Sequence, residues 1–278
     1  MSTVAPRSTD PLDPSTLDAA TLESHPSFAS TLAHGLAVLG CFTGAQPSLG
    51  NKEISDRLGL SKPTISRLTF TLVGLGYLRR EPRTGKYVLG PAVLSLGYPL
   101  LSQLALRQIA ATELYELAVH AHGPVSVGAR DRLQVVYVET VHGAETSMTK
   151  PGIGSTRPML RTAMGRALMY AHPPHERKQI EQRLRHALPD EWNRWSNGLH
   201  AAYAEIEAYG WCIVAGDWQR TLAAVAVPMS APLHGLHLAF SVTVPSYSAE
   251  AKALATDIGP RLQEVVRRVE NALGLESR

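Results

Sequence analysis

The apolar residues near the front of the chain recur at the spacing of a helix. Between residues 28 and 42 they follow one another every three or four positions, at Phe28, Leu32, Leu36, Leu39 and Phe42. This stripe predicts a helix with one apolar face. Residues 44–50, which contain two glycines and a proline, then predict a break.

Two further helices follow at close spacing. The first is predicted over about 51–58 and ends at Gly59. The second begins after Ser61, whose hydroxyl can cap it, with Pro63 in its first turn. Two helices joined by a short turn that contains glycine are typical of a helix-turn-helix.

The second of these helices has two different faces when its residues are placed at 100° intervals. One face carries Ile65, Leu68, Leu72 and Leu75, which we expect to face the core. The opposite face carries Pro63, Ser66, Arg67, Phe70 and Gly74, with Lys62 and Thr64 at its N-terminal edge. A recognition helix presents its base-reading residues at these positions.

Two side chains on that face have distinct expected roles. The guanidinium of Arg67 can donate two parallel hydrogen bonds to a guanine edge or a phosphate. Phe70 has two interpretations: it contacts a thymine methyl group in the major groove, or it packs against the segment that follows.

That segment is a predicted hairpin. Strands are expected at 78–80 and 86–89 around a turn at 82–85, where Gly85 supplies a residue that tolerates positive φ. The hairpin carries Arg79, Arg80, Arg83 and Lys86. Alone it is a solvated basic hairpin; beside a helix-turn-helix it becomes a wing whose cations contact phosphates.

The remaining pattern mixes helices and strands. A helical linker, broken near Pro99, continues to about residue 122. Strands are predicted at 125–130, 134–141, 211–214, 222–227 and 236–244, and helices at 158–170, 176–188, 199–209 and 249–273. Several strands adjacent in sequence, with helices between them, predict an α+β domain around an antiparallel sheet.

Composition and charge narrow the class of protein. The chain has 278 residues, of which 44% are hydrophobic and 18% charged, so most of it can form a core. Its net charge of +3 is uneven: residues 28–90 hold eight basic residues against three acidic ones, whereas residues 1–27 hold one against four. The basic excess therefore coincides with the predicted helix-turn-helix and hairpin, as expected for a domain that binds nucleic acid. Residues 1–27 are predicted to be a disordered tail.

Other functions find little support in the residues. The longest apolar run, residues 222–229, is far too short to span a membrane, and no secretory signal is visible, so we expect a cytoplasmic protein. Cys41 and Cys212 are interpreted as small buried residues. The histidine pairs 120/122, 172/175 and 234/237 lack neighbouring cysteines, so no metal and no cofactor is predicted.

The sequence resembles the IclR family of bacterial transcriptional regulators. The resemblance rests on EISDRLGLSKPTISRL at 53–68, LGYLRR at 75–80 and GKYVLG at 85–90. It continues at VVYVE (135–139), PM with TAMGRAL (158–168) and YGW (209–211). The family implies a winged helix-turn-helix, a GAF-like effector-binding domain, dimers or tetramers, and control of catabolic operons by a small organic acid or aromatic compound.

Departures from the family pattern indicate a rebuilt pocket. Many members have His-Ala where this chain has Leu160-Arg161, and the positions of an acidic segment and a Cys fall here on residues 214–217 and on Ala224. We expect Arg161, near a helix N-terminus, to bind a carboxylate, and Ser241 and Thr243 to share one strand face. The expected effector-binding residues are Met148, Arg161, Thr162, Ala163, Met164, Asp217, Trp218, Ala224, Ser241 and Thr243.

Each of these assignments has a structural alternative. Arg161 could pair with an acidic residue on a neighbouring helix, and Trp218 could lie in a dimer interface. Met148 and Met164 could be core residues, and Ser241 could bond only to the backbone.

The sequence therefore predicts four segments: a tail (1–27), a winged helix-turn-helix (28–90), a linker helix (91–107) and an effector-binding and oligomerisation domain (108–278). The predicted partners are double-stranded operator DNA, an organic acid effector and further copies of the chain. The predicted DNA contacts are Lys52, Lys62, Pro63, Thr64, Ser66, Arg67, Phe70, Arg79, Arg80, Arg83 and Lys86. The alternative is an enzyme that processes small molecules and carries a basic N-terminal docking domain.

Overall fold

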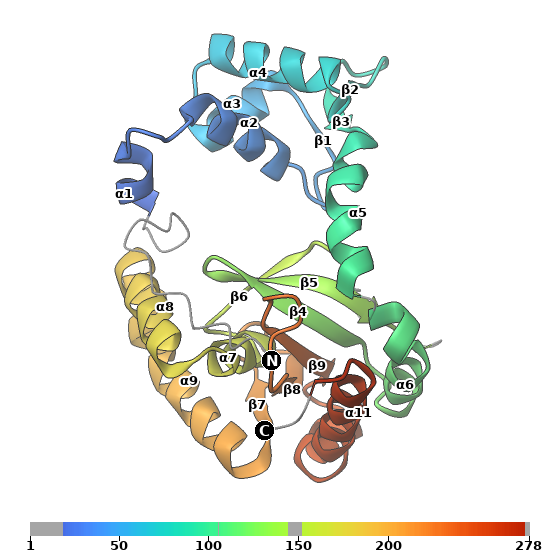
Figure 1. The fold of residues 1–278 in the computed structure, drawn as a ribbon. Coiled ribbons are helices and arrows are strands. Elements are labelled where there is room, and N and C mark those ends of the chain that lie inside the picture. The colour runs from blue at the N-terminus through green and yellow to red at the C-terminus, as the bar shows by residue number, and fades with distance from the viewer. Residues whose placement is uncertain (1–18, 105, 144–151, 276–278) are drawn as a thin grey trace, which may run out of the picture. The chain divides into compact units, whose positions relative to one another are not determined.

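Two short helices form the centre of the N-terminal part of the chain. The computed structural model describes residues 19–104, 106–143 and 152–275, and it divides into two units at residues 102/103 (Figure 1). In the first unit, α3 (Asn51–Leu58) ends at Gly59, which has a φ of 66°, and α4 (Lys62–Gly74) begins after Ser61. The Ser61 hydroxyl accepts a hydrogen bond from the Thr64 amide at 3.4 Å. Both predicted helices and their end signals are confirmed.

The other elements of this unit complete a winged-helix arrangement. They are α1 (Ala19–Ser24), α2 (Ser30–Gly40) and three short strands, β1 (Ser48–Leu49), β2 (Leu78–Arg80) and β3 (Tyr87–Leu89). The strands form an antiparallel sheet in the order β1-β3-β2. The sequence pattern predicted only a break where β1 lies, and α1 lies within the segment expected to be disordered.

The core of the first unit differs from the predicted one at Leu75. Ile65, Leu68 and Leu72 are buried, as predicted for α4. Leu75 is 62% exposed because it is the C-cap of α4, after the last residue that packs on the core. Leu32 and Leu36 of the predicted α2 stripe are also exposed, whereas Val38 is completely buried.

A long helix leads from the first unit to the second. α5 (Ala92–Leu104) passes through Pro99 without a break, so the predicted interruption there is wrong. A proline inside a helix removes one backbone hydrogen bond, and the exposed residues before and after Pro99 show that water can reach that turn.

The second unit is built on a six-stranded antiparallel sheet, which confirms the predicted α+β class. Its order is β6-β5-β4-β9-β8-β7. The strands are β4 (Val125–Asp131), β5 (Gln134–Val141), β6 (Thr156–Pro158), β7 (Cys212–Ala215), β8 (Leu222–Pro228) and β9 (Leu238–Pro245). Pairing of β4 with β9 joins the N-terminal and C-terminal strands of the unit at the centre of the sheet.

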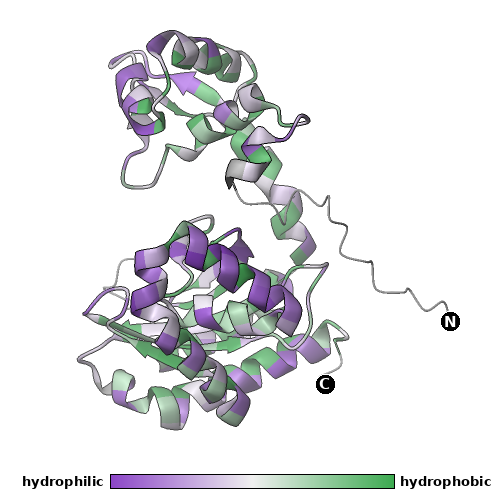
Figure 2. Cartoon of the chain, turned by 90° about the vertical axis from the view of Figure 1, so that its left-hand side faces the viewer, coloured by the Kyte–Doolittle hydropathy of each residue, from purple (hydrophilic) through white to green (hydrophobic). Residues whose placement is uncertain are grey.

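Helices cover both faces of this sheet (Figure 1). One face packs against α7 (Ala163–Ala171), with α8 (Pro174–Ala187) and α9 (Pro189–Tyr209) beyond it. The other packs against α6 (Leu106–His120) and α11 (Gly259–Ala272), which follows α10 (Ala249–Ala253) and a π-helical turn, η2 (Leu254–Ile258). The strands are mostly hydrophobic, whereas the covering helices also carry hydrophilic residues (Figure 2).

The start of α7 lies unusually close to the segment before it. The predicted helix began at residue 158, but residues 156–158 form β6, and α7 begins only after Thr162, whose hydroxyl caps it. A Cβ atom at Gly165 would lie 2.1 Å from the carbonyl oxygen of Met159. Only glycine therefore permits this contact, which places Arg161 and Thr162 over the sheet.

Among the described residues, none of the helices has the length and apolar character needed to cross a lipid bilayer.

Candidate functional site

The predicted recognition face of α4 is open to solvent. Pro63, Ser66, Arg67 and Phe70 are all exposed, and Phe70 is 81% exposed. Phe70 therefore does not pack on the β2–β3 hairpin, which removes one of its two interpretations. A large exposed apolar ring on a basic face is suited to contact with an external partner.

One hydrogen bond from α3 to α4 and one within the first turn of α4 orient this face. The Asn51 side-chain amide donates to the Ser66 hydroxyl at 3.1 Å, and the hydroxyls of Ser61 and Thr64 lie 2.8 Å apart. Within the described ranges, the side chains of Lys52, Lys62 and Arg67 have no hydrogen bond or ion pair. Their charges are available to a partner outside the chain.

The four cations of the hairpin fall into two groups, those with a partner in the chain and those without one among the described residues. Arg80 donates to the carbonyl of Gly85 at 3.2 Å, and Lys86 pairs with Glu53 of α3 at 2.9 Å. The Gly50 amide and, next, Lys86 lower the pKa of the Glu53 carboxyl. Arg79 and Arg83 are exposed and, in the part of the chain that is described, have no side-chain partner. Gly85 has a φ of 69°, which confirms the predicted need for a left-handed residue in the turn.

A pocket in the second unit brings together nine of the ten predicted effector-binding residues. It contains about 410 Å³ of space, part of it open to solvent. Its walls include Arg161, Thr162, Ala163, Met164, Asp217, Trp218, Ala224, Ser241 and Thr243, together with Tyr137, Val214, Gly216, Gln219, Leu222 and Ala223. Met148 lies outside the described residues. The start of α7, the loop after β7 and the strands β8 and β9 form this pocket.

Arg161 lines the pocket but also has internal partners. Its guanidinium donates to the carbonyls of Asp217 at 3.1 Å and Trp218 at 3.2 Å, and it lies 3.4 Å from a Glu191 oxygen of α9. The structure therefore contains the alternative predicted for Arg161, an ion pair with an acidic residue of a neighbouring helix. Arg161 precedes the N-cap of α7, so it is not itself in the first turn of that helix.

Two hydroxyl groups lie at the sheet side of the pocket. Ser241 and Thr243 both line the pocket, as expected for alternate residues of one strand. Among the described residues, neither hydroxyl has a hydrogen-bond partner. Ser241 is therefore not used to bond the backbone, and both groups can bind a ligand or water.

Arg166 contacts residues next to and in the pocket wall. It was not predicted as a site residue. It is 4% exposed, donates to the carbonyl of Leu160 at 2.9 Å and pairs with Asp217 at 2.5 Å. Gly198 of α9 leaves room for its guanidinium, since a Cβ there would lie 2.8 Å from it. An arginine inside an otherwise apolar helix was the available sequence signal, because a buried charge requires a partner.

A second arginine, Arg157, contacts two aromatic residues of the pocket wall. The Arg157 guanidinium lies 4.6 Å from the Trp218 ring centre and 5.4 Å from that of Tyr137. Its Nε atom is buried and lacks a partner among the described residues. Trp218, which lines the pocket, thus has a cation–π contact within the chain.

Both cysteines are buried and unpaired, which confirms their interpretation. Burial raises the pKa of the Cys212 thiol to about 12, so it is not a reactive thiolate at neutral pH.

Known protein families match both units. Residues 31–82 match the IclR helix-turn-helix domain, and residues 99–271 match the C-terminal domain of bacterial transcriptional regulators of the IclR type. A curated relative, the HTH-type transcriptional regulator TsaQ1/TsaQ2 of Comamonas testosteroni, is 33% identical over 89% of this chain and 90% of its own.

Solved structures show the same fold. An IclR family transcriptional regulator from Brucella abortus aligns with a TM-score of 0.80 and 41% identity, over 95% of this chain and 99% of that one. An IclR homologue from Microbacterium hydrocarbonoxydans, crystallised with 4-hydroxybenzoate, aligns with a TM-score of 0.69. It is 20% identical over 88% of this chain and 100% of the other, and this likeness concerns the fold.

Proposed function

Because the chain belongs to the IclR family of bacterial transcriptional regulators, we propose that its exposed cations bind operator DNA and that its pocket binds an aromatic acid. Such a protein acts on the chromosome, in the cytoplasm. The matched families and the curated relative are transcriptional regulators, so the enzyme alternative is set aside.

The observation that carries the DNA-binding role is a set of cations around one exposed helix face that have no partner in the described part of the chain. Arg67 lies on that face of α4, and Arg79 and Arg83 lie on the hairpin that follows it. In this arrangement Arg67 reads a base or a phosphate in the major groove. Arg79 and Arg83 bind phosphates and set the position of α4 on the duplex.

The pocket favours a ligand with an apolar ring and one acidic group. Met164, Trp218 and Tyr137 supply apolar surface, and the free hydroxyls of Ser241 and Thr243 supply polar contacts. Arg161 supplies the positive charge. The presence of 4-hydroxybenzoate in the Microbacterium neighbour supports the same ligand class.

The position of Arg161 suggests how a ligand acts on the loop after β7. Without a ligand, its guanidinium holds the carbonyls of Asp217 and Trp218 and faces Glu191. A ligand carboxylate competes for the same donors, so binding rearranges residues 216–219. The ligand controls DNA binding only if the DNA-competent and DNA-incompetent states bind it with different affinity.

Exposed apolar residues support the proposed homo-oligomer. α2 exposes Leu32 and Leu36, and α5 exposes Leu94, Leu96 and Tyr98, the last at 69%. Such side chains are costly to leave in water and are typical of surfaces that bind another protein chain. Light scattering on the full chain and on Leu94→Lys tests this: a smaller mass for the variant is expected, and an unchanged mass removes α5 from the interface.

One pair of binding experiments tests the function. Footprinting on the fragment upstream of the protein's own gene should show site-specific protection that weakens with salt. 4-Hydroxybenzoate and benzoate should change this protection, and Arg161→Ala should weaken the response while leaving DNA binding without ligand intact.

Different outcomes identify different failures. No preference for any genomic fragment would contradict DNA regulation. An unchanged response in Arg161→Ala would remove Arg161 from the pocket. Turnover of an aromatic acid without operator preference would support the enzyme alternative.

A further inference from the structure

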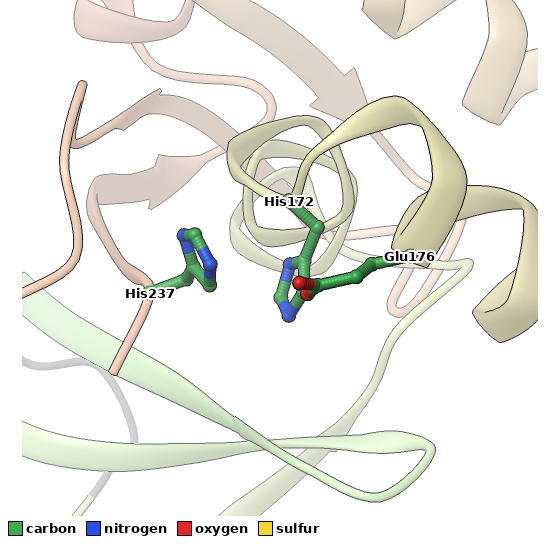
Figure 3. Close-up of side chains that lie close together, drawn as sticks. All are labelled: His172, Glu176 and His237. Carbon is green, nitrogen blue, oxygen red and sulfur yellow. The ribbon is translucent and has the colours of Figure 1, made fainter. Parts of the chain in front are cut away.

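Three side chains that can bind a metal ion meet at the end of α7 opposite the pocket. His172 is the C-cap of α7, Glu176 lies in the first turn of α8, and His237 directly precedes β9 (Figure 3). One ligand atom from each lies within 4.8 Å of the other two. The sequence spacing pairs His172 with His175, whereas the fold pairs it with His237.

Hydrogen bonding already fixes the tautomer of His172. Its Nδ1 atom lies 2.8 Å from the carbonyl oxygen of Leu168, which can only accept, so Nδ1 carries the proton. The lone pair is therefore on Nε2, on the opposite side of the ring. A histidine whose second nitrogen donates to a backbone carbonyl is the arrangement that orients metal-binding imidazoles.

The lone pair of His172 Nε2 accepts a hydrogen bond from a guanidinium group. Arg130 Nε donates to His172 Nε2 at 3.1 Å, and Arg130 NH1 donates to the carbonyl of Arg132 at 2.9 Å. Arg130 is only partly buried and lies at the C-terminal end of β4, next to an exposed residue, so its side chain can turn toward solvent. A cation thus already sits beside the two imidazoles and the carboxylate.

We propose that His172, Glu176 and His237 bind a divalent transition-metal ion, with Zn²⁺ as the ion expected, and that Arg130 is its competitor. Two imidazoles and one carboxylate form a donor set that suits Zn²⁺ and leaves a fourth position for water. The negative end of the α7 dipole favours a cation at this place. The ion would join α7, α8 and β9, and the proposal is independent of the effector.

Cobalt titration of the full-length protein, without an affinity tag, tests the site. Co²⁺ is the probe because a tetrahedral site with nitrogen and oxygen ligands gives it a visible absorption band. We expect one ion per chain, displaced by Zn²⁺. Changing a residue outside the first coordination shell typically costs 10–100-fold in affinity, so His237→Gln and Glu176→Gln should each cost about 100-fold or more.

The variants are chosen to separate binding from folding. His237 and Glu176 are partly exposed, so their substitution should leave the fold intact, as circular dichroism would verify, whereas His172 is buried. His186→Gln, an exposed histidine of the same helix α8, is the matched control and should bind as the wild type does. Arg130→Gln should bind Co²⁺ more tightly than the wild type, because it removes the competing charge.

Two results would overturn the proposal. One is the absence of a saturable, tetrahedral Co²⁺ signal in the wild type. The other is equal affinity in the wild type, His237→Gln and Glu176→Gln, which would assign binding to other surface histidines. If Arg130→Gln binds no more tightly than the wild type, the competitor role of Arg130 is overturned.

Discussion

Three arginines of the first unit and two of the second are used in opposite ways. In the first unit, Arg67, Arg79 and Arg83 are exposed and, within the described residues, have no internal partner for their guanidinium groups. In the second, Arg161 and Arg166 hold carbonyl groups and carboxylates of the same chain. Counting basic residues would not separate these roles. The difference shows that an arginine is available to an external partner only where the fold gives its guanidinium no internal one.

The largest effect is expected where a buried charge loses its partner. Asp217→Asn leaves the buried Arg166 guanidinium without its carboxylate. Removing one member of a buried pair costs about 3–5 kcal/mol, and partial exposure of Asp217 favours the lower end of that range. Chemical denaturation should show this loss in the free energy of unfolding.

A surface pair of the same unit provides the control. Asp131→Asn breaks the exposed pair with Arg132 and should cost less than about 1 kcal/mol. Equal losses for Asp217→Asn and Asp131→Asn would show that Arg166 does not depend on Asp217.

The same glycine substitution should act with opposite sign in the two units. Gly165→Ala places a methyl group against the Met159 carbonyl and should cost about 3 kcal/mol, the upper end for overpacking. Gly35→Ala, in α2, meets nothing within 4 Å and should stabilise the protein by about 0.5–1 kcal/mol. Thermal denaturation of both variants measures the difference, and destabilisation by Gly35→Ala would reveal a contact with another chain.

Arg67→Ala should act on DNA binding and not on folding. It should cost about 1–3 kcal/mol at the operator if Arg67 reads a base, with the free energy of unfolding changed by less than about 0.5 kcal/mol. Gel-shift titrations measure the first quantity, with Arg132→Ala of the second unit as the control. An equal loss on random DNA would make Arg67 a phosphate contact.

The smallest effect is expected at Lys86, because Glu53 already neutralises part of its charge. Lys86→Gln should weaken operator binding less than Arg79→Ala does, and should change stability by less than about 1 kcal/mol. The pKa of Glu53 should stay low in the variant, since the Gly50 amide is its first cause. A Lys86→Gln effect larger than that of Arg79→Ala would contradict the division of the hairpin cations.

Local signals explain what the sequence predicted well. The ends of α3 and α4 depend on Gly59 and Ser61, which act within one turn of the chain. The strands β1 and β6, with two and three residues, are too short to show a periodic pattern, whereas the similarly short β2 and β3 are marked by the turn at 82–85 between them. Whether an apolar face packs within its own chain is also not local, so the predicted stripe did not show that Leu32 and Leu36 are exposed.

The sequence predicted the residues that line the pocket better than the contacts that hold those residues in place. Nine of its residues came from the family resemblance, and all nine line one cavity. The Arg166–Asp217 pair and the Arg157–Trp218 contact join residues 51 and 61 positions apart, which no spacing rule connects. For the same reason, His237 was paired with His234 in sequence but lies beside His172 in the fold.

The salt dependence of operator binding tests most directly the claim that unpaired cations of the first unit bind DNA. The logarithm of the binding constant should fall linearly with the logarithm of salt concentration. The slope for the double variant Arg79→Ala/Arg83→Ala should be smaller than that of the wild type by about 2, or about 1 for each lost phosphate contact. An unchanged slope would contradict the account, because these two charges would then not lie on the DNA backbone.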